Sequence, residues 1–208
     1  MADEDEAAAV GHGEQTAGHE YAERLIGLQQ VWWKRIVPVQ APYRWNIRRL
    51  RLGRVLDVGC GLGRTLHQLD GNGVGVDHNP EFVAHCRASG LTAYTPDEWP
   101  TAPEAVPESF DHIILAHVIE HIEPAVADEI LTTYLPFVRP GGGVHFITPQ
   151  ERGYDSDETH IHFTDFDALV DLATRNGLRV EKSFSFPFPR SFGKAFVYNE
   201  FNVLTRKP

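Results

Sequence analysis

The chain has 208 residues, of which 42% are hydrophobic, so it can bury one core and is most simply a single domain. Its formal net charge is −10, but six of the 29 acids fall in residues 1–20, which contain no Lys or Arg, and the mildly acidic remainder argues against a large nucleic-acid surface. No apolar run reaches the ~18 residues of a membrane span and the acidic start is unlike a signal peptide, so we expect a cytoplasmic protein without a membrane partner.

The N-terminal quarter of the chain divides into a tail and a cap. Residues 1–20 are Ala, Gly and acids without periodicity, and we expect a disordered acidic tail. Residues 21–208 are expected to form the domain, beginning with a helical cap over 21–50. Apolar residues near helical spacing predict a first helix over 21–37, and a second short helix follows Pro42.

The cap is basic and rich in tryptophan. Between Arg24 and Arg54 there are eight Lys or Arg residues, no acid, and three of the four tryptophans. One interpretation is an amphipathic cap with a solvated basic face. The other is a lid in which Arg44 or Lys34 meets the carboxylate of a cofactor while the tryptophans face the substrate.

The stretch from Leu56 to Gly63 organises the rest of the chain. An apolar β-branched run, three alternating glycines and a helix-like segment over 62–69 predict a strand, a tight turn and a helix whose N–H groups face a ligand. Asp77 ends the next apolar run, where a carboxylate can bind both hydroxyls of a ribose. Arg64 replaces the last glycine of a dinucleotide fingerprint, so no diphosphate is indicated.

The segment Leu56-Asp57-Val58-Gly59-Cys60-Gly61-Leu62-Gly63 resembles the first motif of the class I S-adenosylmethionine-dependent methyltransferases, and the resemblance extends from about Leu52 to the C-terminus. It implies S-adenosylmethionine as the cofactor, with Asp57 orienting the loop and holding the cationic amino-acid end. Asp97, with Trp99 stacking, stands where related enzymes place an acidic contact to the adenine, although a plain turn is an equal alternative. The expected cofactor-binding residues are Arg44, Asp57, Gly59, Cys60, Gly61, Asp77, His78, Asp97, Glu98 and Ala116.

Strands and helices alternate through the first two-thirds of the chain. The expected strands after the first cover 74–77, 91–94, 110–116, 144–148, 178–186 and 195–205, and the expected helices cover 79–89, 124–137 and 165–176, with a loop over 101–109. This alternation predicts an α/β fold with a mostly parallel sheet and helices on both faces. The family resemblance adds an antiparallel C-terminal hairpin and a Rossmann-like sheet of seven strands. Cys60 and Cys86 provide neither a disulfide framework nor a metal-ligand pair.

His117, Glu120 and His121 follow the fourth strand directly, at the carboxyl edge where ligands of open α/β sheets bind. If the segment is helical, the three side chains share one face. Two imidazoles and a carboxylate can chelate a divalent metal or supply a catalytic base with an orienting partner, and the alternative is that they cap the strand and pack. The zinc-peptidase motif of the same letters needs a long helix, which Pro124 excludes.

The later segment from Thr159 to Thr164 favours the metal. It resembles the segment that accompanies a Glu-x-x-Glu-His metal site in small-RNA 2′-O-methyltransferases and ubiquinone-pathway O-methyltransferases. The resemblance implies a site of His117, Glu120, His121 and His160, with His117 in place of the first glutamate. The expected metal is Mg²⁺. Histidine in place of glutamate at position 117 favours a softer cation, or a role for His117 as the catalytic base instead of a ligand.

We therefore expect an O-methyltransferase with His117, Glu120 and His121 as catalytic residues, acting on a small sugar or oligosaccharide. Its compact length, tryptophan-rich cap and histidine-rich site are similar to those of small actinobacterial sugar methyltransferases that act in methylmannose polysaccharide synthesis. Five phenylalanines between residues 184 and 196 are either a cover for a ring-bearing acceptor or the core of the last hairpin. A phenol or quinone-precursor acceptor, an RNA 2′-hydroxyl and a non-catalytic adenosylmethionine-binding module are the alternatives.

Overall fold

The computed structural model describes residues 40–208. The predicted acidic tail and the predicted helix over 21–37 lie outside the described residues. None of the helices in the described part of the chain has the length and apolarity needed to cross a membrane.

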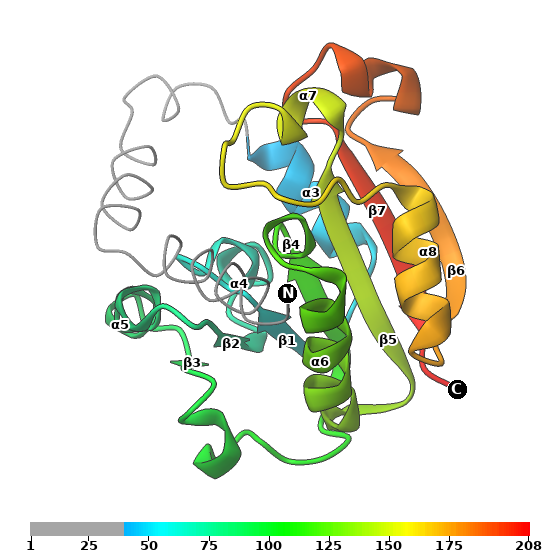
Figure 1. Ribbon diagram of the computed structural model, residues 1–208. Helices are drawn as coiled ribbons and strands as arrows, with labels where there is room; N and C mark the ends of the chain where they lie inside the picture. Colours follow the sequence, from blue (N-terminus) through cyan, green and yellow to red (C-terminus); the bar gives the residue numbers. More distant parts are fainter. Residues whose placement is uncertain (1–39) are drawn as a thin grey trace, which may run out of the picture.

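The elements alternate along the chain as the sequence predicts (Figure 1). The strands are β1 (Val55–Val58), β2 (Gly73–Val76), β3 (Ala93–Tyr94), β4 (Phe110–Ala116), β5 (Val138–Pro149), β6 (Arg179–Phe186) and β7 (Glu200–Arg206). The α-helices are α3 (Ala41–Arg49), α4 (Arg64–Gln68), α5 (Pro80–Ala88), α6 (Pro124–Tyr134), α7 (Glu151–Tyr154) and α8 (Phe166–Arg175). The 3₁₀ turns are η2 (Trp99–Thr101), η3 (Ile119–His121), η4 (Leu135–Phe137) and η5 (Arg190–Lys194).

The strands form one seven-stranded sheet in the order β3-β2-β1-β4-β5-β7-β6. The pairs among β1 to β5 are parallel, and β7 is antiparallel to both of its neighbours, β5 and β6. The Rossmann-like fold and the antiparallel C-terminal hairpin are therefore confirmed. The carboxyl ends of β1, β2 and β4 meet at one edge, and β7 begins at that same edge because it runs the opposite way.

Helices cover both faces of the sheet. The larger core includes apolar side chains of α6, α8 and η2 packed on one face of the sheet, with Leu131 and Leu169 fully buried. On the other face α3 packs through Ile47 against Val55 and Ile114. Because successive side chains along a strand point to opposite faces of the sheet, neighbouring residues of one strand pack against different helix layers.

Three boundaries differ from the sequence prediction. The glycines expected as a turn before the fifth strand lie inside β5, because Gly142 and Gly143 let its backbone pass close to Asp111 and Thr205, whose carbonyl oxygens lie about 2 Å from an added Cβ. The last strand begins at Glu200 rather than at residue 195, since η5 and the Asn199 side chain close the preceding connection. Helix α7 was not predicted.

Candidate active site

The loop between β1 and α4 lies at the carboxyl edge and has its backbone fixed. The N–H groups of Gly59 and Cys60 both donate to the carbonyl of Val76, at 2.8 and 3.1 Å. Gly59 has φ +77°, and a Cβ there would lie 2.3 Å from Val118 Cγ2. Gly61 has φ +51°, and a Cβ there would meet nothing within 4 Å. Gly59 is thus required by packing, whereas Gly61 faces open space of the kind a ligand can use.

Two carboxylates lie beside this loop and are almost fully buried. Asp77 Oδ2 accepts the Gly61 N–H at 2.7 Å and Oδ1 accepts the Asn79 N–H at 2.9 Å, so Asp77 fixes the loop. Asp57 Oδ2 has no hydrogen-bond partner within the described residues. Burial raises the pKa of Asp57 to about 7, and the nearby Asp77 carboxylate adds to the rise while Arg64 opposes it. A buried carboxylate with an unpartnered oxygen suits a cationic ligand.

The other expected cofactor residues are more scattered. His78 is half exposed, with Nδ1 3.6 Å from Asp77 Oδ1, and Ala116 ends β4. Glu98 pairs with Arg87 at 2.7 Å, and Asp97 is exposed in the turn before η2. Arg44 is exposed on α3.

Trp99 does not stack at the edge. It is 2% exposed and packs in the core among the rings of Tyr94, Phe110, Tyr134 and Phe137. Its Nε1 has no partner within the described residues. The expectation that Trp99 stacks on an adenine is therefore corrected, because the apolar burial of this ring holds it beneath the turn.

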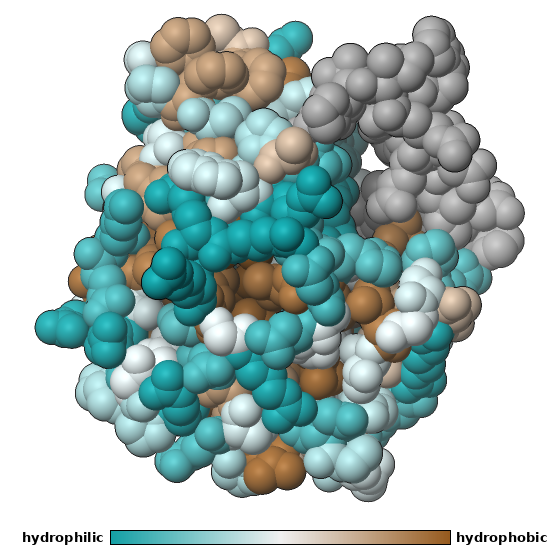
Figure 2. Space-filling model, turned by 180° about the vertical axis from the view of Figure 1, so that it is seen from behind, coloured by the Kyte–Doolittle hydropathy of each residue, from teal (hydrophilic) through white to brown (hydrophobic). Residues whose placement is uncertain are grey.

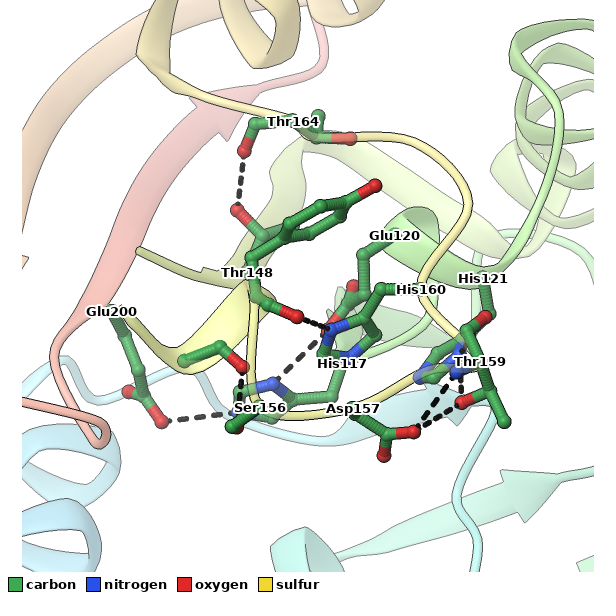
Figure 3. Close-up of polar contacts among 12 residues, drawn as sticks. His117, Glu120, His121, Thr148, Ser156, Asp157, Thr159, His160, Thr164 and Glu200 are labelled. Atoms are coloured by element: carbon green, nitrogen blue, oxygen red, sulfur yellow. Dashed lines mark hydrogen bonds and ion pairs between the residues drawn. The ribbon is translucent and has the colours of Figure 1, made fainter. Parts of the chain in front are cut away.

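His117, the first residue after β4, lies between two carboxylates (Figure 3). Its Nδ1 donates to Glu120 Oε1 at 3.2 Å and its Nε2 donates to Glu200 Oε1 at 3.1 Å. Its backbone is left-handed, with φ +59°, and its N–H donates to Ile147 O at 2.9 Å. Burial would lower the pKa of His117, but the hydrogen bonds to the two glutamates outweigh it and raise the pKa to about 10. Both ring nitrogens are thus occupied and protonated at neutral pH.

Glu120 connects η3 with the loop that follows α7. Its carbonyl accepts the N–H groups of Ile161 and His162, at 2.9 and 3.2 Å, so the segment from Thr159 to Thr164 does reach this edge. Its side chain is fully buried, and Oε2 has no hydrogen-bond partner within the described residues.

Glu120, His121 and His160 form a group that could hold a metal ion. Each offers one ligand atom, and these atoms lie within 4.8 Å of one another. The His160 Nδ1 donates to Tyr154 O at 2.7 Å, which leaves Nε2 with a free lone pair. Burial lowers the pKa of His121, which favours the neutral imidazole that a metal requires. Ligand atoms ~2.1 Å from a tetrahedral ion lie ~3.4 Å apart, so ligand atoms 4.8 Å apart would have to approach by about 1.4 Å to share one ion.

A further contact orients His121. Its Nδ1 lies 3.2 Å from both the carbonyl and the hydroxyl of Thr159, and that hydroxyl donates to Asp157 Oδ1 at 2.8 Å. Such carboxylate and carbonyl partners fix the ring of a metal-binding histidine. His117 is not a member of the three-residue group. Its two nitrogens face Glu120 and Glu200 instead.

Sequence reasoning did not find Glu200, Thr159 or Tyr154 as site residues. Glu200 approaches His117 from β7, 83 positions away in the chain. Nothing local in the sequence marks it, because its place depends on β7 running antiparallel beside β5.

Comparisons with known proteins identify the family of the chain. A family model described as a methyltransferase domain matches residues 33–183. A tRNA U34 carboxymethyltransferase from Pseudoalteromonas translucida is 31% identical over 120 residues, which are 53% of this chain and 34% of that protein. The matched part is therefore about a third of that relative's length.

Solved structures share the fold. A methyltransferase from Archaeoglobus fulgidus aligns with a TM-score of 0.62 and 17% identity, over 79% of this chain and 93% of that chain. The magnesium protoporphyrin IX methyltransferase from Synechocystis, solved with S-adenosylhomocysteine, aligns with a TM-score of 0.58 and 11% identity, over 82% and 85% of the two chains.

Proposed function

Because the chain belongs to the family of S-adenosylmethionine-dependent methyltransferases, we propose that it methylates a hydroxyl of a small sugar or oligosaccharide with the help of a divalent cation. The convergence of Glu120, His121 and His160 at the carboxyl edge of the sheet supports this proposal. Two imidazoles and one carboxylate occupy one side of a cation and leave other positions for acceptor oxygens.

The cofactor is proposed to bind at the β1–α4 loop. Gly61 gives its backbone room, and Asp57 holds the cationic amino-acid end. Asp77 accepts two backbone N–H groups and keeps lone pairs for the ribose hydroxyls. Methyl transfer is an in-line displacement in which the acceptor oxygen forms a bond to the methyl carbon as the sulfur–carbon bond breaks. The acceptor proton leaves as S-adenosylhomocysteine forms.

Glu120, His121 and His160 would hold the cation, which would lower the pKa of a hydroxyl and orient a neighbouring one. Mg²⁺ prefers oxygen ligands, so this donor set favours Mn²⁺ or Co²⁺. Because His117 carries a proton on each ring nitrogen, it can take the acceptor proton only after it has passed one of its own protons to Glu120 or Glu200.

Exposed aromatic rings support a ring-bearing acceptor. Phe188 and Phe192 lie on the connection between β6 and β7 and are 43% and 49% exposed, and an apolar patch lies over this part of the molecule (Figure 2). Phe186 is buried against Tyr43 and Trp45 and belongs to the hairpin core. Phe188 and Phe192 are therefore our candidates for a cover over the acceptor, whereas Phe186 packs in the hairpin core.

The experiment is transfer of labelled methyl from S-adenosylmethionine to mannosides and catechols, with and without EDTA. We expect label on a mannoside, its loss with EDTA, and its recovery with Mn²⁺ or Co²⁺. His160→Ala should abolish the metal response, whereas the matched control His162→Ala, from the same loop but outside the group, should keep it. Transfer to a mannoside that EDTA does not reduce contradicts the proposed role of a divalent cation. Transfer to catechols alone contradicts the proposed sugar acceptor.

One observation favours RNA as a second candidate acceptor. A hollow of about 480 Å³ is lined by residues of α3 and the turn after it, and four of its six lining residues are arginines: Arg44, Arg48, Arg49 and Arg51. Figure 2 looks onto the face that α3 covers, where hydrophilic side chains are frequent. The name of the related tRNA U34 carboxymethyltransferase also supports RNA as an acceptor. Label on short RNAs, lost in Arg51→Glu while S-adenosylhomocysteine binding is kept, would replace the sugar with RNA.

A further inference from the structure

Glu200, near the C-terminal end of the chain, contacts His117, which in turn contacts Glu120 of the candidate metal group. It is the first residue of β7, and its backbone is paired with Pro149 of β5 and Phe186 of β6. Its carbonyl also accepts the Gln150 side-chain N–H at 3.0 Å. The backbone that carries the carboxylate is therefore held by a strand on each side.

The carboxylate of Glu200 is aimed at His117. The side chain is 12% exposed, and Oε1 accepts from His117 Nε2 at 3.1 Å. The opposite nitrogen of the same ring donates to Glu120 Oε1 at 3.2 Å. With a carboxylate at each nitrogen, the imidazole cannot rotate without breaking one of the two bonds. Figure 3 shows the resulting line from Glu200 through His117 to Glu120.

The backbone of His117 indicates that this position is under strain. A φ of +59° is unfavourable for a residue with a Cβ and persists where surrounding contacts require it. Here the N–H of His117 donates to Ile147 O, and the ring is retained by both glutamates.

The contacts from Glu200 through His117 determine the orientation of the Glu120 carboxylate. Oε1 is occupied by His117, and Oε2 is the oxygen left without a hydrogen-bond partner within the described residues. We propose that Glu200 is a positioning residue that acts through His117 to hold Glu120 with its free oxygen toward His121 and His160. Glu200 itself does not touch the cation. The proposal rests on the proposed function, in which the Glu120 group binds that cation.

The test is Co²⁺ binding to the full-length protein by calorimetry and visible absorption at one pH. Glu200→Ala should weaken Co²⁺ binding by up to about tenfold, the low end of the cost of losing a direct partner of a metal ligand, because Glu200 acts one contact further out, through His117. Glu200→Gln keeps an acceptor oxygen in place and should restore most of the affinity. Affinity for S-adenosylhomocysteine should stay within about twofold in both variants. The control is Glu181→Gln, on the neighbouring strand β6 and paired with Arg206.

The outcomes are separable. Glu200→Ala with unchanged Co²⁺ affinity and an unchanged Co²⁺ spectrum overturns the positioning role and leaves the proposed function intact. A loss of affinity that Gln does not restore, accompanied by weaker S-adenosylhomocysteine binding, indicates a general structural role and also overturns it. If the unmodified protein binds no Co²⁺, the proposed function and this inference both fail. If Glu200→Ala does not fold, Glu200→Asp serves as the main variant, because its shorter side chain withdraws the carboxylate from His117 Nε2 and should weaken Co²⁺ binding in the same direction.

Discussion

Replacing Asp57 with Asn should strengthen the cofactor-free fold and weaken cofactor binding. Asp57 is 1% exposed, and burial, with a smaller contribution from Asp77, raises its pKa from 3.8 to about 7. Because the folded pKa lies above the unfolded one, the protonated form is favoured by folding. The associated stability is complete below pH 3.8 and is lost as pH rises through about 7.

The size of the effect follows from the shift. About three pKa units correspond to about 4 kcal/mol, so Asp57→Asn should raise the free energy of unfolding at pH 8 by up to that amount. A cationic cofactor end that requires the carboxylate should also bind about tenfold more tightly at pH 8 than at pH 6. In Asp57→Asn this pH dependence should disappear and the affinity should fall.

The assays are urea unfolding without cofactor at pH 5 and pH 8, and calorimetric titration with S-adenosylhomocysteine at pH 6, 7 and 8. The control is Asp171→Asn, whose carboxylate is 86% exposed. Cofactor affinity that is flat between pH 6 and 8 in the unmodified protein, with no stabilisation by Asp57→Asn at pH 8, would refute the reasoning.

Three further predictions concern single side chains. Gly61→Ala should fold with a loss of ~1–2 kcal/mol of stability, because its backbone is left-handed, and should bind S-adenosylhomocysteine at least about tenfold more weakly. Gly59→Ala should lose more stability, because its Cβ would lie 2.3 Å from Val118. Urea unfolding measures the stability of each variant and calorimetry measures its binding. Trp99→Ala should cost about 3–5 kcal/mol of stability, and Trp99→Phe should retain cofactor affinity, since the ring belongs to the core; loss of affinity in Trp99→Phe without destabilisation contradicts this. Burial lowers the pKa of His145 to about 4, so folding favours the neutral imidazole. The resulting stability of about 3 kcal/mol is present above pH 6.5 and is lost as pH falls through 4. Between pH 6.5 and 4 the free energy of unfolding of His145→Gln should therefore decline less than that of the unmodified protein.

Local patterns in the sequence determined most of the sheet and its helices. The β-branched run before the first glycine, the Asn79-Pro80 helix start and the amphipathic segment after Asp165 each carry their signal within a few residues. In the structure Asn79 and Asp165 both cap helices by accepting backbone N–H groups. The parallel pairing of β1 to β5 also follows, because strands that alternate with helices form parallel neighbours.

Local patterns were misleading where a neighbouring strand decided the outcome. The glycines at 141–143 have the composition of a turn, yet they extend β5 because carbonyl groups of other strands approach there. Trp99 has the neighbours of a surface turn, yet four aromatic rings from elsewhere in the chain enclose it.

The candidate site shows the same division. The sequence by itself brought His117, Glu120 and His121 to the carboxyl edge, since they directly follow a strand, and the family resemblance drew attention to His160. Only the tertiary structure decided that His160 joins Glu120 and His121 while His117 turns to Glu200. That choice depends on a left-handed backbone at His117 and on a carboxylate delivered by an antiparallel strand 83 residues later. Contacts between residues so far apart in the chain leave no periodicity in the sequence, so the fold had to form before the partner of each side chain was known.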